Sequence, residues 1–196
     1  MASLFTKLNK EASSAGIQKN TKKAKKWFSK RIKDLGSVSR NRVLKDDALS
    51  KANRPLIGQM YQYVYDPKHK KTLPYYDKFP LTIFIQPAPK GFHGLNLHYL
   101  SPGVRAEFLD ALMDNAPANI RDASKLKITY DMLKGTQKYD VFKPCFKHYL
   151  MSHVKSEIVR IPMPDWEIAI FLPTEEFKGV KSQSVWRYSR KEYRGK

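Results

Sequence analysis

The sequence predicts an α+β fold with a small antiparallel sheet of about five strands, a helical insertion, and basic helical segments at both ends. The expected order is one helix, three strands, three helices, two strands and a final helix, unlike the regular alternation that produces a parallel sheet. Proline-rich corners separate the short strands and would allow the sheet to close partly into a barrel. The 196 residues are 41% apolar and 12% aromatic, which is enough for a packed core.

The first expected element is a helix from about Thr21 to Gly36. Residues 1–20 show no sustained period, so we expect them to be loosely ordered unless a partner holds them. From Thr21 onward, apolar side chains recur at helical spacing, and Gly36 is typical of a helix end. The helix can pack on the protein's own core, dock onto a partner while its lysines face phosphates, or lie on a membrane surface. Its apolar stripe consists of Ala24, Trp27, Phe28, Ile32 and Leu35.

Three strands are expected next. Residues 37–54 are polar and basic, and we predict a connector with a helical turn or two that ends at Pro55. Residues 59–65 alternate, with three tyrosines on one face and apolar side chains on the other, which indicates a strand with both faces covered. Residues 81–86 and 95–100 form the second and third expected strands.

Three helices and two strands follow. Ser101 and Pro102 are typical of an N-cap and a first helical position, so a helix begins there. A second helix is expected at about 122–134 and a third from Pro144. Residues 157–161 and 166–172 are predicted as strands that flank a hairpin at 162–165. Residues from Pro173 onward are predicted to form a basic helical tail.

The net charge of +19 is concentrated at the two ends of the chain. Residues 1–55 contain 15 Lys and Arg against 4 Asp and Glu, residues 56–177 contain 15 against 13, and residues 178–196 contain 7 against 1. We therefore predict a basic N-terminal arm with an amphipathic helix (1–55), a globular α+β body (56–177) and a basic C-terminal tail (178–196). Such arms contact acidic protein surfaces or DNA phosphates, or merely keep a folded body soluble.

The charged side chains of both arms are the predicted polyanion-binding residues. They are Lys22, Lys23, Lys25, Lys26, Lys30, Arg31, Lys33, Arg40, Arg42, Arg187, Arg190, Lys191 and Arg194. If they contact DNA, binding depends on phosphate charge and weakens with salt, and sequence preference is slight.

Aromatic side chains are the predicted protein-docking residues. They are Trp27, Phe28, Tyr61, Tyr63, Tyr65, Tyr75, Tyr76 and Trp186. Several of the tyrosines, together with Tyr99, could instead form a stacking platform for bases beside the basic loop at 68–71. We favour a protein interface because residues 56–177 lack the charge excess that single-strand binding needs.

Signals for catalysis, cofactors and metals are weak, and we expect no enzyme activity and no cofactor. The glycine-rich nucleotide motifs and the His-Glu-x-x-His zinc motif are missing. Cys145, the single cysteine, cannot form an intramolecular disulfide, and we expect it to pack on one helix face with His148. His93 and His98 lack a carboxylate at metal-ligand spacing. No apolar run reaches the roughly 20 residues of a membrane span, and the N-terminus lacks the apolar stretch of a signal peptide.

Two short patterns have a structural and a functional interpretation. Gly91-Phe-His-Gly94 imitates a loop that clamps RNA backbone, but it lies between strands, so we predict a tight turn in which glycine provides a positive φ. Asp165 followed by Glu176-Phe-Lys178 has the spacing of a metal-dependent nuclease motif. We expect Glu176 to lie instead in the first turn of a tail helix, where acidic residues are favoured.

Several stretches together resemble small virion structural proteins of large contractile-tailed bacteriophages. The resemblance covers roughly residues 21–190 and includes no active-site residue. It rests on Tyr65-Asp-Pro-Lys, Leu73-Pro-Tyr-Tyr-Asp, Gly94-Leu-Asn-Leu-His-Tyr-Leu, Arg160-Ile-Pro, Trp166-Glu-Ile-Ala-Ile-Phe-Leu-Pro and Val185-Trp-Arg-Tyr-Ser-Arg.

The resemblance implies a non-enzymatic assembly protein of a tailed phage, located in the virion and, during assembly, in the host cytoplasm. Its expected partners are other virion proteins of the tail, baseplate or neck, with basic arms that contact acidic protein surfaces or double-stranded DNA. A DNA-binding or DNA-end-protecting protein is the alternative, and a metal-dependent nuclease is the third. No membrane span and no small-molecule substrate are expected.

Overall fold

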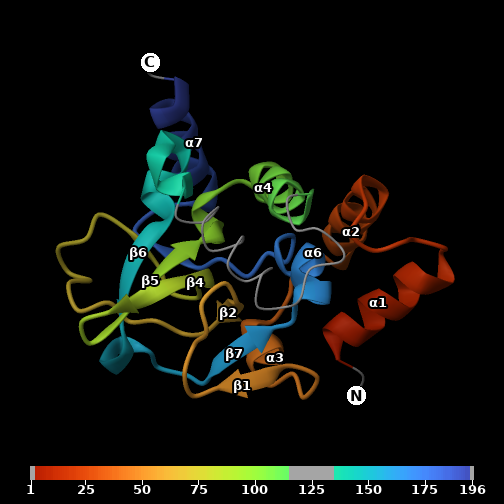
Figure 1. Ribbon diagram of the computed structural model, residues 1–196, viewed down its shortest axis with the longest axis horizontal. Helices are drawn as coiled ribbons and strands as arrows, with labels where there is room; N and C mark the ends of the chain where they lie inside the picture. Colours follow the sequence, from red (N-terminus) through yellow and green to blue (C-terminus); the bar gives the residue numbers. More distant parts are fainter. Residues whose placement is uncertain (1–2, 115–134, 195–196) are drawn as a thin grey trace.

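An antiparallel sheet of six strands lies at the centre of the molecule (Figure 1). The computed structural model describes residues 3–114 and 135–194. In spatial order the strands are β1 (Ser50–Ala52), β7 (Ile158–Ile161), β2 (Met60–Gln62), β4 (Leu81–Ala88), β5 (Gly91–Asn96) and β6 (Phe146–Leu150). Within the described residues β1 and β6 are the two edges and do not pair, so the sheet stays open and no barrel closes. The predicted α+β fold is confirmed.

The helices pack against one face of this sheet, in the main hydrophobic cluster. They are α1 (Leu4–Ser14), α2 (Lys22–Leu35), α3 (Arg40–Leu44), α4 (Pro102–Asp114), α6 (Trp166–Ala169) and α7 (Ser182–Arg194). Short 3-10 helices connect them: η1 (Leu97–Tyr99), η2 (Thr136–Lys138), η3 (Asp140–Cys145), η4 (Met151–His153) and η5 (Met163–Asp165). A separate two-stranded sheet pairs β3 (Tyr76–Asp77) with β8 (Phe177–Lys178). No described helix is long and apolar enough to cross a bilayer.

The predicted amphipathic helix is confirmed as α2. Its N-cap is Thr21, whose side-chain oxygen accepts a hydrogen bond from the backbone N–H of Ala24 at 3.0 Å. Gly36, at φ 71°, ends the helix. Phe28 and Ile32 are buried in the main hydrophobic cluster, and α2 lies beside α6 (Figure 1). The apolar stripe therefore packs on the protein's own core.

The expectation that residues 1–20 are loosely ordered is wrong for helix α1. Ser3 accepts a hydrogen bond from Thr6 N–H and caps the helix. Four apolar side chains of α1 are buried in the same cluster as α2 and the sheet: Leu4, Phe5, Leu8 and Ala12. These residues form one narrow apolar stripe, which gave only a weak periodic signal in the sequence. The stripe is sufficient to fix α1 on the molecule, because α2 lies against it. The basic N-terminal segment is thus packed onto the body.

The predicted strand at 166–172 is also wrong, because residues 166–169 form helix α6. Every residue from Trp166 to Ile170 is buried, so apolar side chains point in all directions and the sequence shows no clear helical period. The predicted hairpin at 162–165 is a proline-containing 3-10 turn, η5, that leads into α6. The strand predicted at 157–161 is confirmed as β7, and the strand predicted at 81–86 as β4.

Three further elements differ from prediction or lie outside the described residues. The helix predicted from Pro144 is the end of η3 followed by strand β6, which pairs with β5. The strand predicted at 95–100 ends at Asn96 and continues as η1. The helix predicted at 122–134 falls outside the described residues, whereas the helix that begins at Pro102 is confirmed as α4.

The tight turn predicted at Gly91–Gly94 is wrong, since both glycines lie within β5. The positive φ belongs to Lys90, at 60°, which precedes the strand. Both glycines are needed for close approach instead. A Cβ at Gly91 would lie 1.8 Å from the carbonyl oxygen of Tyr149, and one at Gly94 would lie 2.2 Å from Cγ2 of Thr82.

We predict that Gly91→Ala destabilises the protein by about 1–3 kcal/mol, because the added methyl group overlaps the backbone of β6. The measurement is the midpoint of thermal unfolding. Gly103→Ala is the matched control, because nothing lies within 4 Å of a Cβ at that helical position. Alanine is the better helix former, so the control should melt at or slightly above the wild-type temperature. Equal melting of the two variants would contradict the close approach of β5 and β6.

Candidate functional site

The three tyrosines of the strand predicted at 59–65, which is observed as a strand only at 60–62, lie inside the molecule. Residues along β2 and β4 alternate between the main cluster and a second, aromatic cluster on the other sheet face, as predicted for the tyrosines and Met60 of the 59–65 segment. Tyr61 and Tyr63 are 2% and 0% exposed, and Tyr65 is 6% exposed. The hydroxyl of Tyr65 accepts a hydrogen bond from the backbone N–H of Leu150 at 3.1 Å. These three side chains, predicted to dock partners, are buried in the aromatic cluster.

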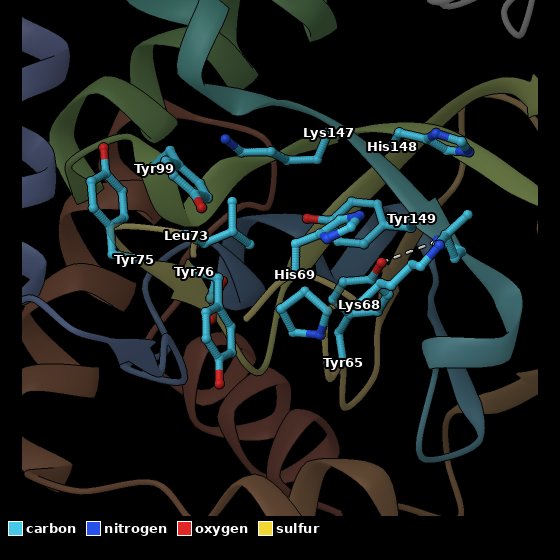
Figure 2. A pocket seen from close by; sticks show the side chains of 13 residues that line it. Tyr65, Lys68, His69, Leu73, Tyr75, Tyr76, Tyr99, Lys147, His148 and Tyr149 are labelled. Atoms are coloured by element: carbon cyan, nitrogen blue, oxygen red, sulfur yellow. Dashed lines mark hydrogen bonds between the residues drawn. The ribbon is translucent and has the colours of Figure 1, made fainter. Parts of the chain in front are cut away.

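A pocket of about 400 Å³ opens between the loop that follows Tyr65 and strand β6 (Figure 2). Two of the predicted aromatic residues, Tyr75 and Tyr76, are half-buried at its wall. The pocket brings together tyrosines and basic side chains from distant parts of the chain. Its lining is Tyr65, Pro67, Lys68, His69, Leu73, Tyr75, Tyr76, Asp77, Tyr99, Lys147, His148, Tyr149 and Leu150.

Lys147 places a positive charge on the aromatic wall. It points from β6 across the pocket, and its ammonium lies 4.3 Å from the centre of the Tyr99 ring (Figure 2). Desolvation by burial lowers the pKa of Lys147 below its usual value, because no carboxylate compensates for the lost water. Among the described residues, Lys147 forms no ion pair with Asp or Glu. Sequence reasoning missed this residue.

Asp77, the one carboxylate in the pocket lining, has both of its oxygens hydrogen-bonded to buried groups of the protein. Its Oδ1 accepts hydrogen bonds from the backbone N–H groups of Phe79 at 3.0 Å and Glu176 at 3.1 Å. Its Oδ2 accepts one from the amide of Asn96 at 3.1 Å and lies 2.7 Å from Nδ1 of His98. Burial alone would raise the pKa of Asp77, but these partners, with His98 foremost, bring it below its usual value. Asp77 therefore does not neutralise Lys147.

The same residues form a row that resembles a catalytic triad but is closed to substrate. Oγ1 of Thr174 lies 3.4 Å from Nε2 of His98. The other ring nitrogen of His98, Nδ1, contacts Asp77. Thr174 and His98 are 0% exposed and Asp77 is 3% exposed. A nucleophile needs access to its substrate, so we assign this row to the interior network that joins β3, η1 and the segment before β8.

Exposed lysines line the outer face of α2. They are Lys22, Lys23, Lys26, Lys30 and Lys33. Two other predicted polyanion-binding residues of this helix are occupied within the chain. Lys25 is buried and pairs with Asp110 of α4. Arg31 binds Glu11 of α1 through Nε at 2.6 Å. The remaining lysines of α2 are exposed, so a polyanion could contact them along the length of this helix.

The remaining predicted basic residues have mixed environments. Arg40 donates hydrogen bonds to the carbonyl oxygens of Thr174 at 2.8 Å and Glu175 at 2.7 Å, so it joins the N-terminal segment to the body. Arg42 and Arg187 are exposed. Arg190, Lys191 and Arg194 belong to α7, but their side chains lie outside the described part of the structure.

The remaining predicted docking residues are partly covered. Phe28 is 0% exposed, and the half-buried Trp27 packs edge-on against it with ring centres 5.1 Å apart. Trp186 of α7 donates a hydrogen bond to the carbonyl oxygen of His98 at 2.9 Å. It also stacks with the guanidinium of Arg105, 5.7 Å from the ring centre. Trp186 thus holds α7 onto the body, whereas Trp27 packs on its helix neighbour at the edge of the main cluster.

The residues of the nuclease-like pattern bind different partners. Asp165 accepts a hydrogen bond from Asn9 at 2.7 Å and faces Lys19 at 3.8 Å. Glu176 precedes β8 and pairs with Lys178 at 2.8 Å, so it is not in a helical turn as expected. Within residues 3–114 and 135–194, no three His, Cys, Asp or Glu side chains form a group suited to a metal ion.

Cys145, the last residue of η3, and His148 of β6 do not form the packed helix face expected from the sequence, nor a pair of nucleophile and base. Cys145 is buried, and burial raises the pKa of its thiol to about 12, the opposite of what a reactive thiolate requires. His148 is exposed, and its Nε2 lies 3.1 Å from the carbonyl oxygen of Pro89. Its ring packs edge-on against that of His93 at 5.1 Å.

Comparison with known proteins identifies the family. The family model described as the phage T4 terminal DNA protecting protein matches residues 1–192. A search of curated proteins and a search of solved structures each find no match. The match confirms the predicted phage protein and favours the DNA-end alternative over a baseplate or neck protein. The chain belongs to the phage T4 terminal DNA protecting protein family.

Proposed function

We propose that this chain binds the ends of linear double-stranded phage DNA and shields them from nucleases. The observation that carries the proposal is the family match over residues 1–192, whose description names protection of terminal DNA. The same match makes tail docking, our first expectation, the weaker interpretation. We also propose that the protein is not an enzyme and that it stays with the genome end in the virion after assembly in the host cytoplasm.

The charge distribution supports contact with duplex DNA. The chain carries a net charge of +19, and five lysines are exposed along α2 while Phe28 and Ile32 hold the same helix on the core. A rigid helix that presents lysines can follow a row of phosphates, and each phosphate contact releases condensed counterions. This contact is independent of sequence, as a protein that serves any genome end requires.

Protection of an end needs no chemistry from the protein. An exonuclease must reach the terminal phosphodiester bond, so a tightly bound protein of 22.8 kDa blocks it by occupying that site. Because basic surfaces also bind the interior of a duplex, protection depends on a preference for ends.

The test is digestion of linear duplex DNA by a processive exonuclease that starts at ends, in the presence of the purified full-length protein. We expect full-length DNA to persist at protein concentrations that leave unprotected DNA fully digested. Linear competitor DNA should abolish protection, whereas the same mass of covalently closed circular DNA should have little effect.

Two outcomes would contradict the proposal. Rapid digestion at saturating protein would show that the bound protein does not shield ends. Equal competition by circular and linear DNA would show that the protein binds phosphates anywhere along the duplex. An endonuclease control, which cuts internal sites, should remain active on the protected DNA.

A further inference from the structure

The pocket beside β6 combines aromatic rings with a positive charge, whereas the exposed face of α2 offers lysines. Its wall is formed by aromatic rings, with Tyr75 and Tyr99 centred 6.1 Å apart and Phe177 packed behind both. Lys147 adds a positive charge over the Tyr99 ring. Aromatic rings beside a cation are the two components that bind a base and a phosphate.

The charges around the pocket favour an anionic ligand. Lys68 is exposed in the pocket lining, and Lys147 forms no ion pair within the described residues. Asp77, the one carboxylate in the lining, is held by His98 and backbone N–H groups. A half-buried ammonium without a counter-ion is costly, and a phosphate that reaches it would remove that cost.

The size of the pocket fits a single nucleotide. A volume of about 400 Å³ is at the lower end of the range for small-molecule sites, and it does not form a groove for a long strand. A base within a duplex can enter only after it is unpaired and unstacked, which costs a few kcal/mol, whereas a base at an overhang or frayed end is already free. Such a pocket distinguishes an end from the duplex interior.

We propose that this pocket binds the unpaired terminal nucleotide of a DNA strand, with its base against the tyrosines and its phosphate at Lys147. The inference rests on the proposed end-binding function and explains how that function separates ends from interior. Tyr76, which is half-buried at the rim, stacks on the base. Lys68, which is exposed and lines the pocket, provides further positive charge for the adjoining phosphates.

The experiment compares the affinity of full-length protein for fluorescent duplexes of equal length. One end of each duplex is closed by a hairpin. The other end is closed, blunt, or carries a short 5′ or 3′ overhang, with or without a 5′-phosphate. We expect an overhang to bind about 10-fold more tightly than a closed end, the factor expected from one stacked base. If the affinity for a 5′ overhang depends on the 5′-phosphate, Lys147 binds the terminal phosphate monoester. If the affinity does not depend on it, Lys147 binds the adjoining phosphodiester.

Variants connect this preference to the pocket. Tyr76→Ala should abolish most of the roughly 10-fold preference for an overhang over a closed end, and Lys147→Met should reduce it, while Tyr76→Phe and Lys147→Arg retain most of it. The matched controls are Tyr139→Ala, at a tyrosine that is 62% exposed, and Lys155→Met, at an exposed lysine. Neither lines the pocket. Thermal unfolding confirms that each variant is folded.

The results separate the pocket from the proposed function. Unchanged overhang preference in both Tyr76→Ala and Lys147→Met would overturn the pocket assignment. Exonuclease protection by wild-type protein without any overhang preference would also overturn it, while the proposed function stands. Pocket-dependent overhang preference without exonuclease protection would retain the nucleotide site and reject protection.

Discussion

Replacing Asp77 with alanine is expected to lower the free energy of unfolding by about 3–5 kcal/mol. The carboxylate is 3% exposed and accepts hydrogen bonds from two backbone N–H groups and the Asn96 amide, besides its contact with His98. Its removal leaves all of these donors buried without a partner. Because they come from β5, η1 and the segments after β3 and before β8, the loss should loosen several elements together.

Chemical denaturation of the wild type and Asp77→Ala measures this loss. Asp47→Ala is the matched control, because Asp47 is exposed, and it should change stability by less than about 0.5 kcal/mol. A loss at Asp77 below about 1 kcal/mol would show that the buried network is not a main source of stability.

The contribution of Asp77 should depend on pH in a defined direction. The pKa of Asp77 in the folded protein lies below its ordinary value of 3.8, so the folded state favours the ionised carboxylate. Its stabilisation is therefore fully present above about pH 4 and is lost as pH falls through the lowered pKa. The difference in stability between the wild type and Asp77→Ala should shrink below pH 4. A difference that grows on acidification would contradict the assigned direction.

Elements whose apolar residues recur with a clear helical or strand period could be predicted from the sequence. Elements that are buried on all sides could not. Helix α2 has a polar and an apolar face, and its N-cap Thr21 and terminal Gly36 are local signals. Strand β4 likewise follows Pro80, although it continues through Pro87 to Ala88. Residues 166–172 are buried in nearly every position, so the alternation of Trp166 with Ile168 was compatible with a strand although the chain forms α6.

The site could be predicted only in part, because its residues come together through long-range contacts. The tyrosines and the loop at 68–71 were recognised as a possible stacking site, but Lys147 is brought to Tyr99 only by the pairing of β5 with β6. Lys25 and Arg40 looked like free cations. Their partners are 85 and 134 positions away, so no local pattern could show that they are occupied.

Glutamine at all five exposed lysines of α2 (22, 23, 26, 30 and 33) is expected to weaken duplex DNA binding roughly 100-fold at low salt. If each lysine neutralises one phosphate, the slope of log affinity against log salt should also decrease by about 4 to 5. Substitution is a sharper test than deletion of the segment, because Phe5 and Phe28 belong to the core. Glutamine is nearly as good a helix former as lysine, so the fold should persist.

The matched control tests whether the position of the charges matters beyond their number. Glutamine at five exposed lysines on other elements (45, 51, 138, 155 and 181) removes the same charge from the chain. Because phosphates follow a continuous path along the duplex, lysines on one helix face should contribute more than scattered ones. Titrations at several salt concentrations should therefore show a small decrease in slope for the scattered set. Equal slopes for the two variants would mean that net charge alone attracts DNA and that α2 is not the contact surface.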